Sequence, residues 1–182
     1  DFVVVVGTGG VGTYAVQIAA ASGATVVAVD IEDAHLEPLL AHGAAATVNA
    51  RGLSPRDVRD RVREHARSSG VAPTGWKVFE CSGTPPGQET AFGLLGPAAT
   101  LAVVGFTREK VSIRLSNLMA FDATAFGSWG CPPELYPEAI DLVTSGRVDL
   151  LPFTRKVPMG DLESVLAAAH GRSDPRRTIL VP

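Results

Sequence analysis

Cysteine is scarce in this sequence, and its scarcity argues against two kinds of stabilised architecture. Only Cys81 and Cys131 occur, far apart, and neither has a second cysteine or a histidine close by. This spacing supports neither a disulfide framework nor a zinc-binding motif. We therefore expect a protein of the reducing cytoplasm, held together by a core to which a hydrophobic content of 46% can contribute.

Long apolar runs and an excess of basic charge are also missing. The apolar run at residues 2–6 is far shorter than the roughly 18 residues of a membrane helix, and no basic segment precedes it. The net charge is −3 with acids and bases interspersed, so we predict no surface for nucleic acid or membrane. The expected partners are a small-molecule substrate and other subunits. Because Asp1 directly precedes a predicted central strand, we also interpret the chain as a fragment.

Short valine-rich runs alternate with longer helical patterns along the first two thirds of the chain. Such alternation is typical of crossover units that feed a parallel sheet. We predict an α/β fold, a doubly wound parallel sheet of the Rossmann type. The predicted strands are residues 2–6, 25–29, 46–48, 77–80, 100–104 and 123–128, and the predicted helices are residues 11–22, 32–42, 55–69 and 88–95.

The pattern changes after residue 128. Gly130, Pro132 and Pro133 interrupt the alternation. Beyond them we predict a helix at 134–145, short extended pieces, a helix at 161–170 and a strand at 178–181. We divide the chain into a dinucleotide-binding domain, residues 1–128, and a C-terminal segment, residues 129–182.

A glycine-rich turn follows the first predicted strand and opens a helix. Its sequence is Gly7-Thr8-Gly9-Gly10-Val11-Gly12. In a dinucleotide-binding turn Gly7 permits the tight bend, Gly9 lets a pyrophosphate approach the backbone, and Gly12 lets helix and strand pack closely. A plain structural turn is the alternative, but the strand, turn, helix and strand context favours cofactor binding.

Asp30 ends the second predicted strand, where a carboxylate can accept hydrogen bonds from both hydroxyls of an adenosine ribose. Its negative charge opposes the 2′-phosphate of NADP, and the residues after it add acids but no arginine. NAD is therefore the predicted cofactor. Asp30 as a simple N-cap of the next helix is the alternative.

Ligands of open parallel sheets lie beyond the carboxyl ends of the strands. That rule selects residues 80–83, which include Ser82, residues 104–106, which are Val104, Gly105 and Phe106, and residues 126–128. We predict that these small and apolar groups line a nicotinamide slot. Ordinary packing at strand ends explains each of them equally well.

These motifs together resemble the zinc-type medium-chain alcohol dehydrogenases. The resemblance covers essentially the whole chain and rests on the glycine-rich turn, Val29-Asp30, His42-Gly43-Ala44, Val48-Asn49, Phe79-Glu80-Cys81-Ser82-Gly83, Val104-Gly105 and Arg177-Thr178-Ile179-Leu180. It implies hydride transfer between an alcohol and NAD, with Arg177 reaching the pyrophosphate. It also implies that His35 lies near the adenosine ribose, where the family often has Lys or Arg. Without the resemblance, the better interpretation of Arg176 and Arg177 is a solvated charged pair.

The resemblance further implies that residues from about 129 onward rejoin a catalytic domain. In the family the zinc ligands and proton relay precede the dinucleotide fold, so we expect zinc only in the absent catalytic domain. We assign no catalytic residue to this chain and expect it to be inactive alone. Pairing through the edge strand that ends near Ser128 implies a homo-oligomer, a dimer or tetramer.

A narrower resemblance is carried by residues 115–123 and by Trp129-Gly130-Cys131. This run is similar to dehydrogenases that oxidise 6-hydroxycyclohex-1-ene-1-carbonyl-CoA. The alternatives are a zinc-free enoyl or quinone reductase, a non-catalytic NAD-binding module, and a structural domain with an empty site.

The histidines and cysteines are not predicted to bind metal. His35 and His42 are seven residues apart on one predicted helix and are expected to be solvated, while His65 and His170 are expected at the periphery. We interpret Cys81 as a small group near the nicotinamide and Cys131 as a core thiol or a dimer-edge residue.

Overall fold

The computed structural model describes residues 1–171 and 176–182, and its centre is a parallel sheet of six strands. The strand order is β3-β2-β1-β4-β5-β6, and every neighbouring pair is parallel. The order reverses between β1 and β4, so the predicted doubly wound sheet is confirmed. The strands are β1 (Phe2–Val6), β2 (Thr25–Asp30), β3 (Ala44–Asn49), β4 (Lys77–Glu80), β5 (Thr100–Val103) and β6 (Thr124–Gly127).

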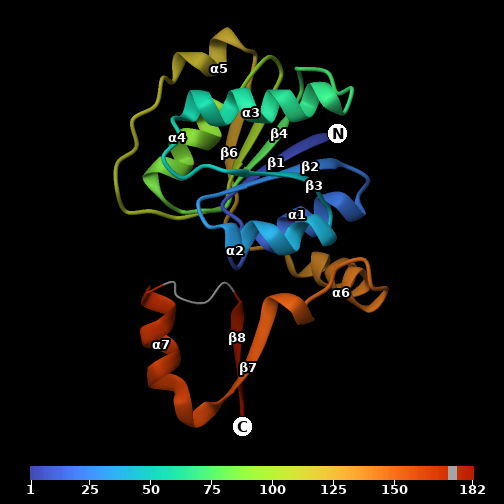
Figure 1. The fold of residues 1–182 in the computed structure, drawn as a ribbon, viewed down its shortest axis with the longest axis vertical. Helices are drawn as coiled ribbons and strands as arrows, with labels where there is room; N and C mark the ends of the chain where they lie inside the picture. Colours follow the sequence, from blue (N-terminus) through green and yellow to red (C-terminus); the bar gives the residue numbers. More distant parts are fainter. Residues whose placement is uncertain (172–175) are drawn as a thin grey trace.

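Helices cover both faces of this sheet (Figure 1). One face carries α1 (Gly12–Ala21), α2 (Asp33–Leu36) and the 3₁₀ helix η1 (Glu37–Ala41), and the other carries α3 (Pro55–Ser68) and α4 (Pro85–Gly93). Side chains of β1 alternate between the two layers, because successive residues of a strand point to opposite faces. Val4 and Val6 pack with the α3 side, and Val3 and Val5 with the α1 side.

The predicted helix at residues 32–42 is not one continuous α-helix. It is the short α2 followed by η1, and Pro38 lies in the first turn of η1. Proline has no amide to donate to the carbonyl one turn earlier, which accounts for the end of the α-helical hydrogen bonding at this point. The helix predicted at 88–95 begins earlier, at Pro85, because Thr84 accepts a hydrogen bond from the Gly87 amide and caps it. The short α5 (Ser116–Ala120) was not predicted.

Residues after β6 form a separate arrangement below the sheet in Figure 1. Two parallel strands, β7 (Thr154–Pro158) and β8 (Arg177–Val181), pair only with each other. The helical pieces are η2 (Pro133–Leu135), α6 (Tyr136–Thr144), η3 (Leu151–Phe153), η4 (Met159–Asp161) and α7 (Leu162–Gly171). The architecture changes after β6. The domain boundary at residue 128 and the assignment of this segment to a catalytic domain stay predictions.

Contacts of Asp149 and Phe153 help to attach the C-terminal segment to the α1 face. The side chain of Gln17 on α1 accepts a hydrogen bond from the Asp149 amide at 2.7 Å and donates one to the Asp149 carbonyl at 3.2 Å. Phe153 is buried in the core layer of α1 and packs edge-on against His42. Within the described part of the chain, none of the helices is both long and apolar enough to span a bilayer.

Candidate dinucleotide site

The glycine-rich turn lies where β1 passes into α1, and two of its glycines have no room for a side chain. Gly7 has φ +85°, and a Cβ on it would lie 2.5 Å from the backbone of Ser82. A Cβ on Gly12 would lie 1.8 Å from the Gly7 carbonyl oxygen. The turn therefore requires glycine at both positions for close packing, and it brings Ser82 directly against β1's exit.

Gly9 differs from these two because a Cβ on it would have nothing within 4 Å. It therefore faces open space at the start of α1, where helix amides and the helix dipole attract negative charge. Arg177 reaches the same turn from β8, and its Nη2 donates to the Gly10 carbonyl at 3.1 Å. The structure thus brings Arg177 to the glycine turn from the far end of the chain. Its contact with a phosphate stays a prediction.

The Asp30 carboxylate lies beside the glycine-rich turn and accepts several hydrogen bonds. Its Oδ2 accepts from the Thr8 amide at 2.6 Å and the Thr8 hydroxyl at 3.0 Å. Its Oδ1 accepts from the amides of Ile31 and Glu32 at 2.7 and 3.0 Å. Because the N-cap of α2 is Glu32, the alternative that Asp30 is simply that cap is not what the structure shows. Asp30 instead ties the end of β2 to the turn.

His35 faces Asp30 rather than solvent, contrary to the sequence expectation. Its Nδ1 lies 3.3 Å from Asp30 Oδ1, close enough for an ion pair although poorly aligned for a hydrogen bond. Burial alone would raise the pKa of Asp30, but the His35 imidazole and two backbone amides outweigh it and lower that pKa to about 2. Contact with Asp30 in turn raises the pKa of His35. The acid is therefore charged throughout the neutral range.

We expect this depressed pKa to make folding stability depend on Asp30 at acid pH. A carboxylate with a folded pKa of about 2 and an ordinary value of 3.8 stabilises the fold fully above about pH 4, and the contribution is lost as pH falls toward 2. The shift corresponds to about 2 kcal/mol. The measurement is the difference in unfolding free energy between the wild type and Asp30→Asn from pH 6 to pH 2. A difference that does not change with pH would contradict the assignment.

Beyond β4 and β5 the chain forms two exit loops joined by a buried carboxylate. Glu80 is fully buried, and its Oε1 accepts from the Ser82 amide at 2.8 Å, the Ser82 hydroxyl at 2.5 Å and the Gly83 amide at 3.1 Å. Its Oε2 has no partner among the described residues and lies 2.7 Å from where a Cβ of Gly105 would be. Gly105 must therefore be glycine for the loops to meet.

Exposed apolar groups lie around these exit loops. Val104 directly follows the end of β5, Phe106 is largely exposed, and Phe126 lies on β6 with about half of its surface exposed. These residues and Ser82 accordingly stand at the predicted edge of the sheet. Whether they bind a nicotinamide stays a prediction.

Cys81 is partly buried and packs against the core layer of α1. Burial and the neighbouring Glu80 charge raise the pKa of its thiol to about 12. Cys131 is exposed, so its interpretation as a core thiol is wrong.

We expect a thiol reagent at pH 8 to modify Cys131 quickly and Cys81 only after unfolding. The thiolate is the reactive form, and at a pKa near 12 it makes up only about one in ten thousand Cys81 side chains. The measurement is labelling followed by mass spectrometry, with Cys131→Ser as the control that should show no fast labelling. Rapid modification of both thiols in the folded protein would contradict it.

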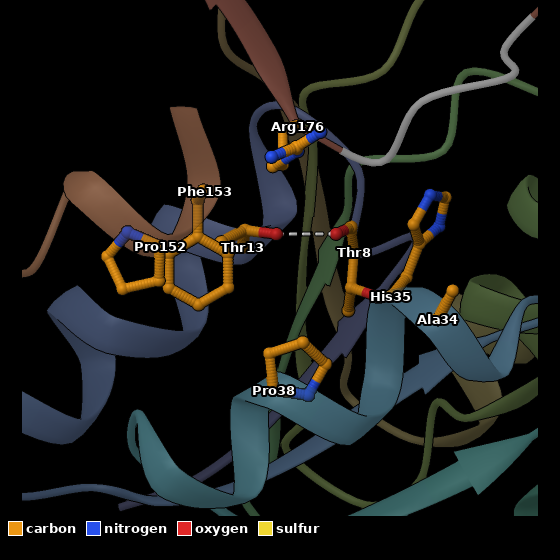
Figure 2. A pocket seen from close by; sticks show the side chains of 8 residues that line it. All are labelled: Thr8, Thr13, Ala34, His35, Pro38, Pro152, Phe153 and Arg176. Carbon is orange, nitrogen blue, oxygen red and sulfur yellow. Dashed lines mark hydrogen bonds between the residues drawn. The ribbon is translucent and has the colours of Figure 1, made fainter. Parts of the chain in front are cut away.

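A cleft of about 160 Å³ lies between the glycine-rich turn and the C-terminal segment. Figure 2 shows Phe153 and Pro152 on one side and His35 on the other, with Thr13 donating a hydrogen bond to Thr8 between them. Arg176 lines this cleft, and Arg177 contacts Gly10, so the two arginines are not simply a solvated pair. The cleft is lined by Thr8, Thr13, Ala34, His35, Pro38, Pro152, Phe153 and Arg176.

His42 and His65 are not among the residues that line this cleft. His42 donates from Nδ1 to the Pro38 carbonyl at 2.7 Å, so it is held by protein contacts. His65 is half-buried on α3, and the side chain of His170 lies outside the described residues. Among residues 1–171 and 176–182, no group of three or more His, Cys, Asp or Glu side chains is placed to hold a metal ion.

Sequence reasoning missed Arg51 and Asn49 as part of this site. Asn49 donates to Asp33 at 2.6 Å, and Arg51 forms an ion pair with Glu32. Both come from the exit of β3, which the parallel register places beside the end of β2. Asn49 entered the sequence analysis only through the family resemblance, and Arg51 lies in no motif. Only the strand pairing could therefore have revealed their contacts with the segment after β2.

Comparison with known proteins gives a consistent family match. The model of the family described as "Zinc-binding dehydrogenase" matches residues 10–145. Galactitol 1-phosphate 5-dehydrogenase of Escherichia coli (strain K12) is 27% identical over 99% of this chain and 53% of its own length. D-xylulose reductase of Saccharomyces cerevisiae is 30% identical over 82% of this chain and 42% of its own length.

The solved structures agree on the fold. A crystal structure of galactitol-1-phosphate dehydrogenase from Escherichia coli superposes with a TM-score of 0.85 at 24% identity, over 100% of this chain and 54% of that one. The chain thus spans about half the length of the relatives it matches.

Proposed function

This chain belongs to the zinc-binding dehydrogenase family, and on that premise we propose that it binds NAD along the carboxyl edge of its sheet. In the complete enzyme the bound cofactor would exchange a hydride with an alcohol. The observation that carries the proposal is the convergence of three features: the open face of Gly9 at the start of α1, the charged Asp30 beside it, and Arg177 at Gly10.

The residues present fit the adenosine diphosphate half of NAD. A pyrophosphate in the space beside Gly9 would meet the amides at the start of α1 and the Arg177 guanidinium. The ribose diol would lie at Asp30, where the longer contact, from the Thr8 hydroxyl at 3.0 Å, gives way to a ribose hydroxyl. His35 would flank that ribose.

The nicotinamide half would lie over the exits of β4, β5 and β6. NAD supplies the hydride-accepting ring, and the protein positions it. Ser82, Val104, Gly105 and Phe106 provide a small, partly apolar surface there, and Glu80 fixes the shape of the first loop through its Oε1 hydrogen bonds. This arrangement suits a chain whose role is to position the nicotinamide ring for hydride transfer.

The charged Asp30 supports NAD over NADP. At a pKa of about 2 this carboxylate is ionised at any physiological pH, so it repels a 2′-phosphate.

The zinc of the family is considered separately from NAD. The described residues hold no cluster of three ligands, so the family's metal does not fit them, and we derive no step through it.

Two substrate classes are candidates. The names of the relatives point to polyols and their phosphates, because those proteins act on galactitol 1-phosphate or D-xylulose. The run at residues 115–123 resembles enzymes that oxidise a cyclic hydroxyacyl-CoA. We favour the polyols, since the matches at sequence level cover most of the chain, and keep the acyl-CoA as the second candidate.

A substrate panel tests the proposed function. Binding is followed by the change in fluorescence when NADH or, separately, NADPH is added to the protein. Turnover is followed as NADH formation with NAD and one of three substrates: galactitol 1-phosphate, xylitol or 6-hydroxycyclohex-1-ene-1-carbonyl-CoA. We expect NADH to bind, with turnover restricted to one substrate class once the catalytic part is supplied. Binding with no turnover in that complete enzyme favours an NAD-binding module, and a preference for NADPH favours a reductase.

We further propose that the protein forms a homo-oligomer. β6 is the last strand of the sheet and is exposed along its whole length, with the exposed Trp129 just beyond it. Unpaired strand edges associate readily, so we propose that two copies pair along β6. Light scattering would give the mass of a dimer, whereas a monomer at every concentration would contradict this pairing.

We also propose that the protein is cytoplasmic, because its two cysteines are free thiols.

A further inference from the structure

The segment after β2 is held by the segment after β3. Residues 30–33 are here called the acidic segment, and residues 49–51 the β3 exit. The parallel register pairs Asp30 with Asn49, so the two strand ends lie side by side. Hydrogen bonds run from the β3 exit to every residue of the acidic segment: Ala50 N to Asp30 O, Arg51 Nε to Ile31 O, Arg51 Nη2 to Glu32 Oε1, and Asn49 Nδ2 to Asp33 Oδ1.

Arg51 supplies the positive charge among these contacts, and its guanidinium forms an ion pair with Glu32. Its Nη2 lies 2.5 Å from Glu32 Oε1, and its Nε donates to the Ile31 carbonyl at 3.1 Å. The two side chains are 61% and 51% exposed. An ion pair with that exposure adds little to stability. We therefore consider what this ion pair does to the charge beside the proposed ribose site rather than to stability.

An arginine beside an adenosine ribose is the group that accommodates the 2′-phosphate of NADP, through a fork of N–H donors. Arg51 stands next to the segment that carries Asp30, yet two of its donors are already used on that segment. The carboxylate of Glu32 also cancels its charge. Removing Glu32 would therefore both release the guanidinium and delete a negative charge.

We propose that Glu32 is a specificity-determining residue that keeps Arg51 from binding a 2′-phosphate, so that the site rejects 2′-phosphorylated adenosine by two acids rather than one. Asp30 repels the phosphate directly, and Glu32 occupies the arginine that the β3 exit places beside it. This inference rests on the proposed NAD site at the same strand end.

The test is a double-mutant cycle at low ionic strength, where charge effects are least screened. Dissociation constants for NAD and NADP are measured by calorimetry for the wild type, Glu32→Gln, Arg51→Gln and the double variant. The same cycle is repeated in Asp30→Asn, where direct repulsion is removed and NADP binding is easier to measure. Glu37→Gln on η1 is the matched control, because it deletes the same charge at an exposed residue outside the β3-exit contacts.

We expect Glu32→Gln to tighten NADP about tenfold relative to NAD, the size expected for one added charge contact. The gain should vanish in the double variant, and Glu37→Gln should change the ratio less than about twofold. Equal effects of Glu32→Gln and Glu37→Gln, or a gain that survives loss of Arg51, would overturn the inference. Wild-type protein that binds neither cofactor overturns the proposed function and this inference with it. NAD binding with an unchanged NADP ratio overturns this inference alone.

Discussion

Replacing Gly12 with alanine is expected to lower the free energy of unfolding by about 3 kcal/mol, whereas replacing Gly9 should leave stability nearly unchanged and abolish tight NAD binding. The Gly12 methyl would lie 1.8 Å from the Gly7 carbonyl oxygen, so β1 and α1 must move apart. The Gly9 methyl meets no protein atom within 4 Å and projects into the space proposed for the pyrophosphate.

The two variants are each other's control, because the same methyl is added three residues apart in one turn. Thermal unfolding should show a melting point lower by roughly 6–12 °C for Gly12→Ala and a change of no more than about 2 °C for Gly9→Ala. Calorimetric titration with NAD should show at least a tenfold weaker affinity for Gly9→Ala, since the methyl keeps the phosphate from the amides. Wild-type affinity in a folded Gly9→Ala protein would place the pyrophosphate elsewhere.

Asp30→Asn is expected to weaken NAD binding by roughly 30- to 100-fold, or about 2–3 kcal/mol, because hydrogen bonds to a charged acceptor are worth about that much. An amide has only one acceptor oxygen and cannot receive both ribose hydroxyls while also holding the Thr8 amide. The discrimination against NADP should fall at the same time, since the charge that repels the 2′-phosphate is gone.

Asp33→Asn is the matched control for that measurement. It removes a neighbouring charge on the exposed segment after β2, and Asp33 contacts Asn49 rather than the glycine-rich turn. Its NAD affinity should stay within about twofold of the wild type. If both variants lost the same affinity, overall charge rather than a ribose contact would explain the loss, and the role assigned to Asp30 would be wrong.

The sheet could be predicted from the sequence because its central strands are short apolar runs between turn residues. The boundaries of β1 and β4 match the prediction, and β2, β3, β5 and β6 differ at their ends. Hydrophobic pattern fixes which residues are buried, but the last residue of a strand depends on where its neighbours end. Val104, for example, was placed in β5, and its amide instead donates to the Glu80 carbonyl as the exit loop begins.

The candidate site was predictable where one local segment carries the geometry and not where distant segments meet. The roles proposed for Gly7, Gly9 and Gly12 follow from a turn of six residues. The contact of Arg177 with Gly10 was implied only by family resemblance, because no local pattern links positions so far apart. The close approach of Gly105 to Glu80 and the ion pair of Arg51 with Glu32 depend on contacts between neighbouring strand ends.

The expectation that His35 would be solvated failed for a related reason. Helical spacing places it on an outer face, but α2 is only one turn long and directs the imidazole back to Asp30, leaving 20% of the side chain exposed. A pattern of hydrophobicity carries no information on which polar group a histidine will meet.

The most direct test of the central claim is the melting point of the chain in parallel titrations with NAD and NADP. A ligand that binds only the folded state stabilises it by mass action, about 2.7 kcal/mol at a hundredfold excess over its dissociation constant. We predict a rise of roughly 5–10 °C with NAD and at most a small rise with NADP. No rise with NAD, or an equal rise with both cofactors, would contradict the assignment of the glycine-rich turn and Asp30 to an NAD site.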